Sequence, residues 1–405
     1  MRDRFKIGES QVMAERAYLD WNASAPLRPE ARAAVIAALE LDAGNPSSVH
    51  REGRAGRRLI EDAREKVAAL VGADPSRVIF TSGGAEANML ALSPTSEQGS
   101  LLVSAIEHPS VRSGGWFPAD RVGEIPVRAS GEVDLVALER RLADAARARR
   151  GPVLVSIMLA NNESGVIQPV EQAAEIVHAA GALLHIDAIQ AAGRIPCNME
   201  RLRADLMSLS GHKLGAPKGV GALVRGNSAI DVRPLIRGGG QERGLRAGTE
   251  NVAGIAGFGA AAEAAGRGLE AESARVERLR DRLEAGLRQV SPSAIVFGAG
   301  RNRLPNTTLF AVPGVKAETA VIALDLEGVA VSSGAACSSG KVQPSHVLAA
   351  MGVPPELNGG AVRVSLGWDT TDSDLECFFA AWLKFCGALH RLRGEVAACG
   401  SMTRG

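Results

Sequence analysis

The strongest constraint on the fold is the alternation of short apolar runs with amphipathic segments across residues 28–258. The apolar runs predict strands, and the segments between them place apolar residues three and four positions apart, which is typical of helices. Alternating strands and helices build βαβ units, so we predict an α/β fold with a mainly parallel sheet covered by helices on both faces. The expected strands are 78–81, 101–104, 153–159, 182–186, 206–210 and 221–224, and the expected helices are 56–71, 135–146 and 170–180.

The length of 405 residues is enough for two domains and a short arm. We expect an N-terminal arm over 1–24, a large domain over 25–265 and a smaller α+β domain over 266–405, with the arm packing on the smaller domain. The boundary follows an Ala- and Gly-rich helix near 251–265, because the charged stretch at 272–290 is typical of a solvated helix. In the smaller domain the expected strands are 307–311, 330–331 and 362–365, and the expected helices are 317–326 and 373–391.

Charge and composition exclude several classes of protein. The 46 Lys and Arg residues against 45 Asp and Glu give a net charge of +1, so no bulk attraction to nucleic acid or to an anionic membrane is expected. We find neither a signal-peptide pattern nor the roughly 18 consecutive apolar residues of a membrane span, and we expect a cytoplasmic protein. The first twelve residues are polar and lack periodicity, so Met1 and Met13 are both candidate starts.

The five cysteines are scattered, with neither a disulfide framework nor a paired zinc spacing, so no intrinsic metal site is expected. Cys337 is flanked only by small residues, in the run Ser-Ser-Gly-Ala-Ala-Cys-Ser-Ser-Gly, and we expect it to be exposed and reactive. Cys377 and Cys386 lie on the expected terminal helix. We expect these two to be buried as small apolar residues.

Lys213 ends the run Ser-Leu-Ser-Gly-His-Lys, directly after an expected buried strand. In open α/β sheets ligands bind at the carboxyl ends of the strands, and a desolvated lysine there suits Schiff-base chemistry. Ser210 and His212 are then candidate donors to a phosphate. An ordinary loop lysine would give the same pattern.

Asp187 also follows an apolar strand, in the run His-Ile-Asp-Ala-Ile-Gln. A carboxylate there needs a cationic partner, and the protonated pyridine nitrogen of pyridoxal phosphate is one such partner. Gln190 is then a candidate to reach the phenolic oxygen of that cofactor. The alternative is an aspartate that caps the next helix.

Three further turns follow expected strands. The run Thr-Ser-Gly-Gly-Ala-Glu precedes a helix, so the backbone N–H groups of Gly84 and Ala85 can cradle a phosphate, although such turns are common. His108 can stack on a planar cofactor or move protons, although a lone histidine is more often structural. Asn162 can bind a hydroxyl or a carboxylate, although a strand-terminating turn has the same composition. The turn at Gly83 lacks the G-x-G-x-x-G pattern of dinucleotide-binding oxidoreductases.

These motifs occur in one order along one chain, together with Arg-Gly-Leu-Arg-Ala-Gly-Thr at 243–249 and Arg-Val-Ser-Leu at 363–366. Together they resemble the cysteine desulfurases of the class V aminotransferase family, of the NifS/IscS-like group with a long cysteine loop. The resemblance begins at Tyr18-Leu-Asp20 and covers nearly the whole chain. It implies the fold type I scaffold of pyridoxal-phosphate enzymes, with a seven-stranded type of sheet.

The resemblance also implies roles for single residues. Lys213 would carry pyridoxal phosphate covalently, Asp187 would face the pyridine nitrogen, Gln190 the phenolic oxygen and His108 the ring. Phosphate contacts are implied for Gly84, Ala85, Ser210, His212 and, from the other subunit of a homodimer, Thr249. Arg363 and Asn162 would hold the substrate carboxylate, and Asn162 would also contact the cofactor.

The implied reaction converts L-cysteine to L-alanine, with Lys213 and His108 moving protons and Cys337 taking the sulfur as a persulfide. The sulfur would pass to an iron–sulfur scaffold or another acceptor protein, and Cys337 could transiently bind a cluster. Details near Lys213 resemble the nitrogen-fixation subgroup. The alternatives are another class V aminotransferase, a selenocysteine lyase, or a non-catalytic scaffold that binds sulfur acceptors.

The chain departs from the family pattern at a few positions. Ala85 stands where a threonine is usual, which removes one hydroxyl hydrogen bond to the phosphate. The run from Trp21 to Ala25 replaces the usual Asn-Ala-Thr-Thr, and Trp368 stands where an arginine or similar polar residue is common. These departures put substrate preference and rate in doubt more than the class of reaction.

Overall fold

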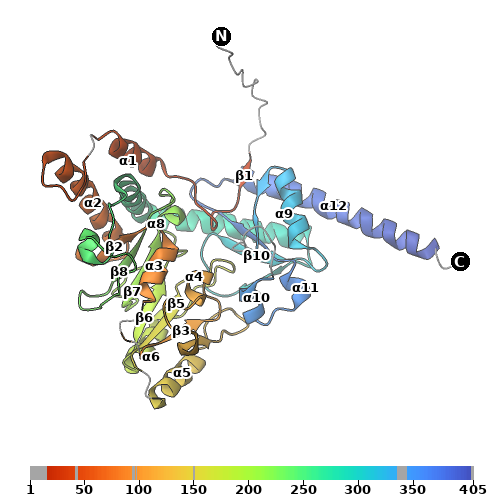
Figure 1. The fold of residues 1–405 in the computed structure, drawn as a ribbon. Coiled ribbons are helices and arrows are strands. Elements are labelled where there is room, and N and C mark those ends of the chain that lie inside the picture. Colours follow the sequence, from red (N-terminus) through yellow and green to blue (C-terminus); the bar gives the residue numbers. More distant parts are fainter. Residues whose placement is uncertain are drawn as a thin grey trace, which may run out of the picture.

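The computed structural model describes residues 16–402 apart from 42–43, 94–95, 97, 149–150 and 335–343, with side chains described as far as Arg391 (Figure 1). The helices are α1 (Pro29–Leu39), α2 (Arg51–Leu70), α3 (Gly84–Ala91), α4 (Pro109–Arg112), α5 (Leu135–Arg147), α6 (Val170–Ala179), α7 (Gly211–Leu214), α8 (Val252–Val290), α9 (Ala317–Leu326), α10 (His346–Ala350), α11 (Pro355–Asn358) and α12 (Asp372–Met402). The strands are β1 (Ala17–Tyr18), β2 (Val78–Thr81), β3 (Ser100–Ser104), β4 (Val122–Ile125), β5 (Val153–Met158), β6 (Leu183–Asp187), β7 (Leu206–Ser210), β8 (Gly221–Arg225), β9 (Ile295–Val296), β10 (Thr307–Ala311), β11 (Val329–Ala330), β12 (Ser332–Ser333) and β13 (Val362–Ser365).

A seven-stranded sheet forms the centre of the larger part, in the order β2-β8-β7-β6-β5-β3-β4. Its pairings are parallel except those of β8, which is antiparallel to both neighbours. The predicted fold class is therefore confirmed, and the six predicted strands are present with ends shifted by no more than one residue. The seventh strand, β4, was not predicted, because its sequence Val-Gly-Glu-Ile is short and lacks an apolar run.

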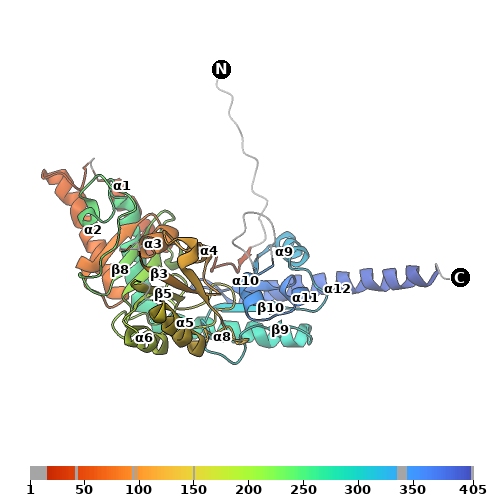
Figure 2. The same ribbon diagram turned by 60° about the horizontal axis from the view of Figure 1, so that its bottom comes forward.

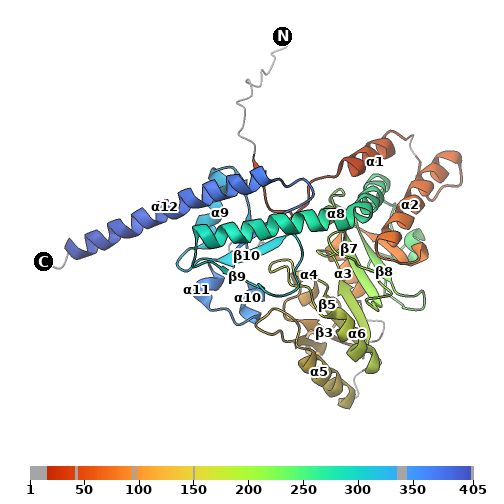
Figure 3. The ribbon, with the colours of Figure 1, turned by 180° about the vertical axis from the view of Figure 1, so that it is seen from behind.

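Helices cover both faces of this sheet (Figures 1 and 3), and an apolar cluster lies on each face. One face packs on α2, α5, α6 and α8, whose buried side chains include Ile60, Leu138, Val177 and Phe258. The other packs on α3 and α4, through Leu90 and Val111. Because both faces of the sheet are covered by helices, a ligand can approach the sheet at the ends of its strands, where polar groups lie.

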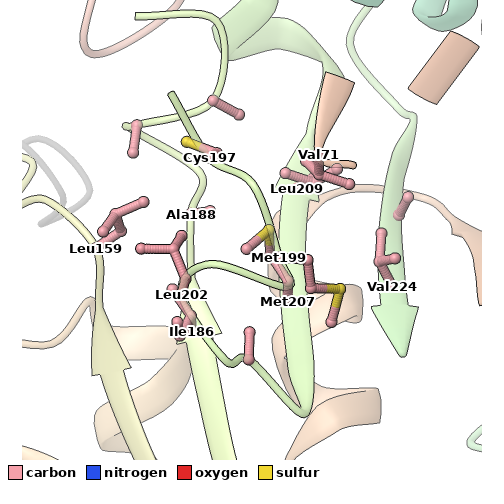
Figure 4. Packing of buried hydrophobic residues seen from close by; sticks show 14 of the residues in the cluster. Val71, Leu159, Ile186, Ala188, Cys197, Met199, Leu202, Met207, Leu209 and Val224 are labelled. Atoms are coloured by element: carbon pink, nitrogen blue, oxygen red, sulfur yellow. The ribbon is translucent and has the colours of Figure 1, made fainter. Parts of the chain in front are cut away.

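Figure 4 shows how the chain before β7 closes part of this core, with Cys197, Met199 and Leu202 lying against residues of β6 and β7. Burial raises the pKa of the Cys197 thiol to about 12, so it stays protonated and is no candidate nucleophile. The prediction that Cys377 is buried was wrong. Its side chain is exposed, because it lies on the solvent side of α12 next to the buried Phe378, and Cys386 is half-buried.

A second core lies under an antiparallel sheet of order β12-β13-β10-β9, packed on α9 and α12. The chain from Arg16 to Leu19 joins this part, since β1 pairs in parallel with β11. The predicted boundary at 265–266 falls inside α8, a single helix of 39 residues that contacts α1 and α2 at one end and α12 and β10 toward the other. The division into domains stays a prediction.

Helices α8 and α12 lie side by side, and α12 continues past the rest of the molecule (Figures 2 and 3). Among the described residues, neither of these helices nor any other has a stretch apolar and long enough to cross a bilayer.

Candidate active site

A cavity of about 310 Å³ lies at the carboxyl ends of β5, β6 and β7. This is the edge where an open α/β sheet binds ligands. It is also lined by residues near the N-terminus and by Arg363 from β13, so both cores contribute. The predicted site residues that line it are Gly84, Ala85, His108, Asn162, Asp187, Gln190, Ser210, His212, Lys213 and Arg363.

Asp187, His108, Asn88 and Ser110 form one hydrogen-bonded side of this cavity, which we call the sheet wall. The Asn88 amide donates to Asp187 Oδ2 at 2.8 Å and to Ser110 Oγ at 2.9 Å. Ser110 Oγ lies 2.8 Å from His108 Nδ1. Burial raises the pKa of the Asp187 carboxyl, and burial also lowers the pKa of His108, so the imidazole is neutral at neutral pH.

The sequence analysis missed Asn88 and Ser110. The sequence indicated them only by their spacing from predicted site residues. Asn88 lies four residues after Gly84 on the same helix face, and Ser110 lies two residues after His108. Neither residue type is specific enough to identify a site without a partner across the sheet.

A buried row of polar side chains crosses the sheet two residues before Asp187. His185 lies 2.8 Å from Ser156 Oγ through Nδ1 and 2.9 Å from Ser208 Oγ through Nε2, so it links β5, β6 and β7. Burial lowers the pKa of His185 to about 3, and the ring is therefore neutral. This row fixes the strand that carries Asp187.

Lys213 lies on the short helix α7 and faces a segment that we call the strap, residues 20–28. The Lys213 amine donates to the backbone carbonyls of Asn22 at 2.5 Å and Ala23 at 2.8 Å. Gln190 Nε2 donates to the same Asn22 carbonyl at 3.0 Å. The strap therefore holds two predicted site residues through its backbone.

The expected phosphate cradle lies where α3 begins. Gly83 precedes α3 without a side-chain cap, which leaves the first amides of the helix directed toward the cavity. A Cβ at Gly84 would lie 2.4 Å from Ile189 Cδ1 and 3.2 Å from Ser210 Cβ, so a larger residue there would have to displace the Ile189 side chain. Ala85 offers its backbone alone. Burial lowers the pKa of His212 to about 4, so its ring is neutral, and Nδ1 lies 3.3 Å from Ser24 Oγ.

Arg363 is 2% exposed and ties the strap to the turn after β5. Its two Nη atoms donate to the Asn162 carbonyl and to Asp20 Oδ1, both at 2.9 Å. Its Nε is buried and has no hydrogen-bond partner in the described part of the chain. A buried guanidinium whose Nε–H no described residue accepts is suited to a carboxylate ligand.

Glu163, next to Asn162, accepts a hydrogen bond from Ser345 Oγ. Burial raises the pKa of the Glu163 carboxyl to about 7. Ser332, on the other side of the 335–343 segment, donates to Asp20 Oδ2 at 2.8 Å. Cys337 itself lies outside the described residues, and the described chain on either side of it is bound to residues beside the cavity.

Thr249 is exposed and is absent from the described residues that line the cavity of its own chain. The segment before it is held by a buried pair, in which Arg64 donates to both Glu242 oxygens at 2.7 and 2.9 Å. Glu242 and Arg243 both have positive φ, 48° and 59°. Arg246 forms a further ion pair with Glu86 at 2.9 Å, which connects this segment to α3.

Residues 17–378 match the family described as aminotransferase class-V. The chain belongs to this family. Among its class-V relatives, the cysteine desulfurase of Gluconacetobacter diazotrophicus is 43% identical over 369 residues, with 89% of this chain and 90% of the relative covered. The cysteine desulfurase IscS of Dictyoglomus turgidum is 42% identical, with 90% and 92% covered.

A solved structure with the same fold supports this. The crystal structure of a NifS-like protein from Rickettsia africae has a TM-score of 0.84 at 36% identity and covers 92% of this chain and 100% of its own. The predicted resemblance to NifS/IscS-like cysteine desulfurases is therefore confirmed.

Proposed function

We propose that the protein is a pyridoxal-phosphate-dependent cysteine desulfurase, which converts L-cysteine to L-alanine and passes the sulfur through a persulfide on Cys337 to an acceptor. The observation that carries the proposal is that one cavity unites Lys213, Asp187 and Arg363. These supply an amine for the cofactor aldehyde, a carboxylate for its ring nitrogen and a cation for the substrate carboxylate. The names of the relatives support the same activity.

The residues of the cavity fit pyridoxal phosphate. The buried Asp187 carboxylate accepts from two neutral donors, the Asn88 amide and the Ile189 N–H at 3.0 Å, so a cationic ring nitrogen would offset its cost of desolvation. The uncapped start of α3 at Gly84 fits the phosphate. Ser210 and His212 would add side-chain donors, and Gln190 would face the phenolic oxygen.

Arg363 and Asn162 would bind the carboxylate of L-cysteine. Arg363 lines the cavity, and its buried Nε has no acceptor among the described residues, which supports a carboxylate partner for this side chain. Lysine could not replace it, because a point charge lacks the planar fork that matches a carboxylate.

Lys213 would move protons at the α and β carbons of the substrate once its amine is released. His108 is neutral because of burial, so it can accept a proton at neutral pH. When bound, the cofactor supplies an electron sink for the substrate carbon. The Cys337 thiolate attacks the substrate sulfur: an S–S bond forms, the C–S bond breaks, and the β carbon takes up a proton to give alanine.

The chain would act as a homodimer. Thr249 is exposed and lies apart from the cavity lining of its own chain, which supports its use at the phosphate of the other subunit. The acceptor would be an iron–sulfur scaffold or another sulfur-acceptor protein in the cytoplasm, and Cys337 could bind a cluster transiently. Relatives carry both the IscS and the NifS-like name, so the choice between general and nitrogenase-related assembly calls for inspection of the neighbouring genes.

Cys337→Ser tests the proposal. The variant is expected to keep the visible absorbance of the cofactor-loaded protein and to lose at least 100-fold in sulfide release from L-cysteine under reductant, because only the sulfur-accepting atom is changed. Cys377→Ser, on the exposed face of α12, serves as the control and is expected to match the unmodified protein. Unchanged turnover in Cys337→Ser would favour another class V reaction.

Lys213 is tested separately by borohydride reduction of the loaded protein and peptide mapping. Label on the Lys213 peptide is expected. Label on a different lysine, or a protein that stays colourless after incubation with pyridoxal phosphate, would reject the cofactor assignment.

A further inference from the structure

The strap surrounds the turn that carries Lys213. Besides the two carbonyls that accept from the Lys213 amine, Arg28 binds this turn twice, through its backbone N–H to the Gly215 carbonyl at 2.9 Å and through Nε to the Leu214 carbonyl at 3.1 Å. Ala25 N–H donates to the His212 carbonyl at 2.9 Å. Each residue from 212 to 215 thus contacts the strap, and the position of the strap sets the position of the lysine.

Three successive strap carbonyls accept from Lys213, Gln190 and Arg194. Those of Asn22 and Ala23 accept from Lys213, that of Asn22 also accepts from Gln190, and that of Trp21 accepts from Arg194 at 3.3 Å. These carbonyls therefore fix where the Lys213 amine lies relative to Gln190 and Arg194.

Trp21 fixes the start of this row through a contact with Trp368. The two indole rings are 4.5 Å apart between centroids and meet edge to face at 80°. Both rings pack closely on glycines, since a Cβ at Gly367 would lie 2.0 Å from the Trp21 ring and a Cβ at Gly215 would lie 2.4 Å from the Trp368 ring. The Arg28 guanidinium lies over Trp368 at 4.0 Å.

The pair joins three parts of the molecule: the strap, the chain after β13 and the Lys213 turn. Trp21 and Trp368 also line, together with Lys213, a second, smaller cavity next to the active site. These are the two positions at which the sequence departs from the family pattern with a tryptophan. Their contact shows that the two departures form one structural unit.

We propose that Trp21 and Trp368 are positioning residues for Lys213, acting through the carbonyls of Asn22 and Ala23. The proposal rests on the proposed function only in that Lys213 is the cofactor lysine. Without the aromatic contact the strap loses one of its anchors, and the carbonyls that accept from the Lys213 amine are displaced.

The test measures Lys213 in the cofactor-free protein, by its rate of modification with trinitrobenzenesulfonate at pH 8, read on the Lys213 peptide by mass spectrometry. Trp21→Ala and Trp368→Ala are each expected to raise this rate about fivefold, the equivalent of one hydrogen bond. The double variant is expected to show no more than the larger single effect, because both remove the same contact. Trp116→Ala, at a tryptophan that is 63% exposed, is the matched control and is expected to leave the rate unchanged.

The loaded variants give a second readout. The kcat for L-cysteine is expected to fall by a larger factor than KM rises, because the strap holds Lys213 directly through two carbonyls and touches Arg363 through Asp20. Trp368→Phe, which keeps a ring edge, is expected to restore most of the kcat. An unchanged Lys213 modification rate in folded alanine variants, or effects that add, would overturn the proposal. If the alanine variants lose their thermal unfolding transition, Trp368→Leu supplies the same test. Borohydride mapping stays independent, so a failure here is separable from a failure of the cofactor assignment.

Discussion

The sheet wall and the strap hold the same cavity by different means. In the sheet wall, side chains bind side chains: Asn88 joins Asp187 to Ser110, and Ser110 joins His108. In the strap, the acceptors for Lys213, Gln190 and Arg194 are backbone carbonyls of Trp21, Asn22 and Ala23. A side-chain contact can be removed by one substitution, whereas a carbonyl can only be displaced, so single changes are expected to act strongly on the first and weakly on the second.

The largest effect is expected in the sheet wall. Asp187→Asn keeps the size of the side chain but removes its charge, and the loss of a carboxylate aimed at a cationic ring nitrogen is expected to lower kcat at least 100-fold, about 3 kcal/mol. Steady-state sulfide release measures kcat and KM, and thermal unfolding checks the fold. A loss of less than tenfold would contradict the role of the carboxylate. It would also mean that the sheet wall is no more sensitive to a single substitution than the strap.

A smaller effect is expected from the buried row of His185, Ser156 and Ser208 next to the sheet wall. It is a dependence of the free energy of unfolding on pH. His185 is neutral when folded, with a pKa of about 3, and takes up a proton when unfolded below about pH 6.5. The unfolded state therefore binds more protons in this range, and the free energy of unfolding falls as pH is lowered, by about 2 kcal/mol between pH 7 and pH 5 from this group.

His185→Gln is expected to remove this part of the pH dependence in urea unfolding, and His390→Gln, at an exposed histidine, is the control. An identical slope in His185→Gln and the unmodified protein would contradict the assignment of a buried neutral ring.

The smallest effect is expected next to the strap. Arg194 donates to both the backbone and the side-chain oxygen of Gln190, and burial, with Arg363 nearby, lowers its pKa to about 9. Arg194→Met is expected to raise the dissociation constant of pyridoxal phosphate about fivefold, near 1 kcal/mol, because Gln190 is still held by the Asn22 carbonyl.

Arg194→Lys keeps a donor and is expected to lose less, while Arg201→Met, at an exposed arginine, is expected to change nothing. A 100-fold loss in Arg194→Met would mean that the strap is as easily broken as the sheet wall.

The difference between side-chain and backbone contacts also decides what could be predicted from the sequence. Strand periodicity located the strands, and because parallel strands end at one edge, it also brought Asp187, Asn162 and Lys213 together. The edge strand β4 lacked that signal. A carbonyl oxygen is present in every residue, so no pattern could indicate that those of Asn22 and Ala23 hold Lys213.

Contacts between residues far apart in the chain also could not be predicted from the sequence. Asp20 was quoted only as the start of the family resemblance, yet it binds Arg363, 343 positions away. The two tryptophans were noted separately as departures, and only the fold brings their rings into contact. The roles of the site residues stay predictions until the variants are measured.

The segment that ends near Thr249 has a consequence for assembly. Left-handed backbone at Glu242 and Arg243 costs about 1–2 kcal/mol for each residue, and the buried Arg64 fork offsets that cost within the monomer. In the proposed homodimer the incoming subunit would therefore meet a surface whose shape is already set. The segment would therefore lose little conformational entropy when the subunits associate. The cost of its left-handed backbone would already have been offset when each chain folded.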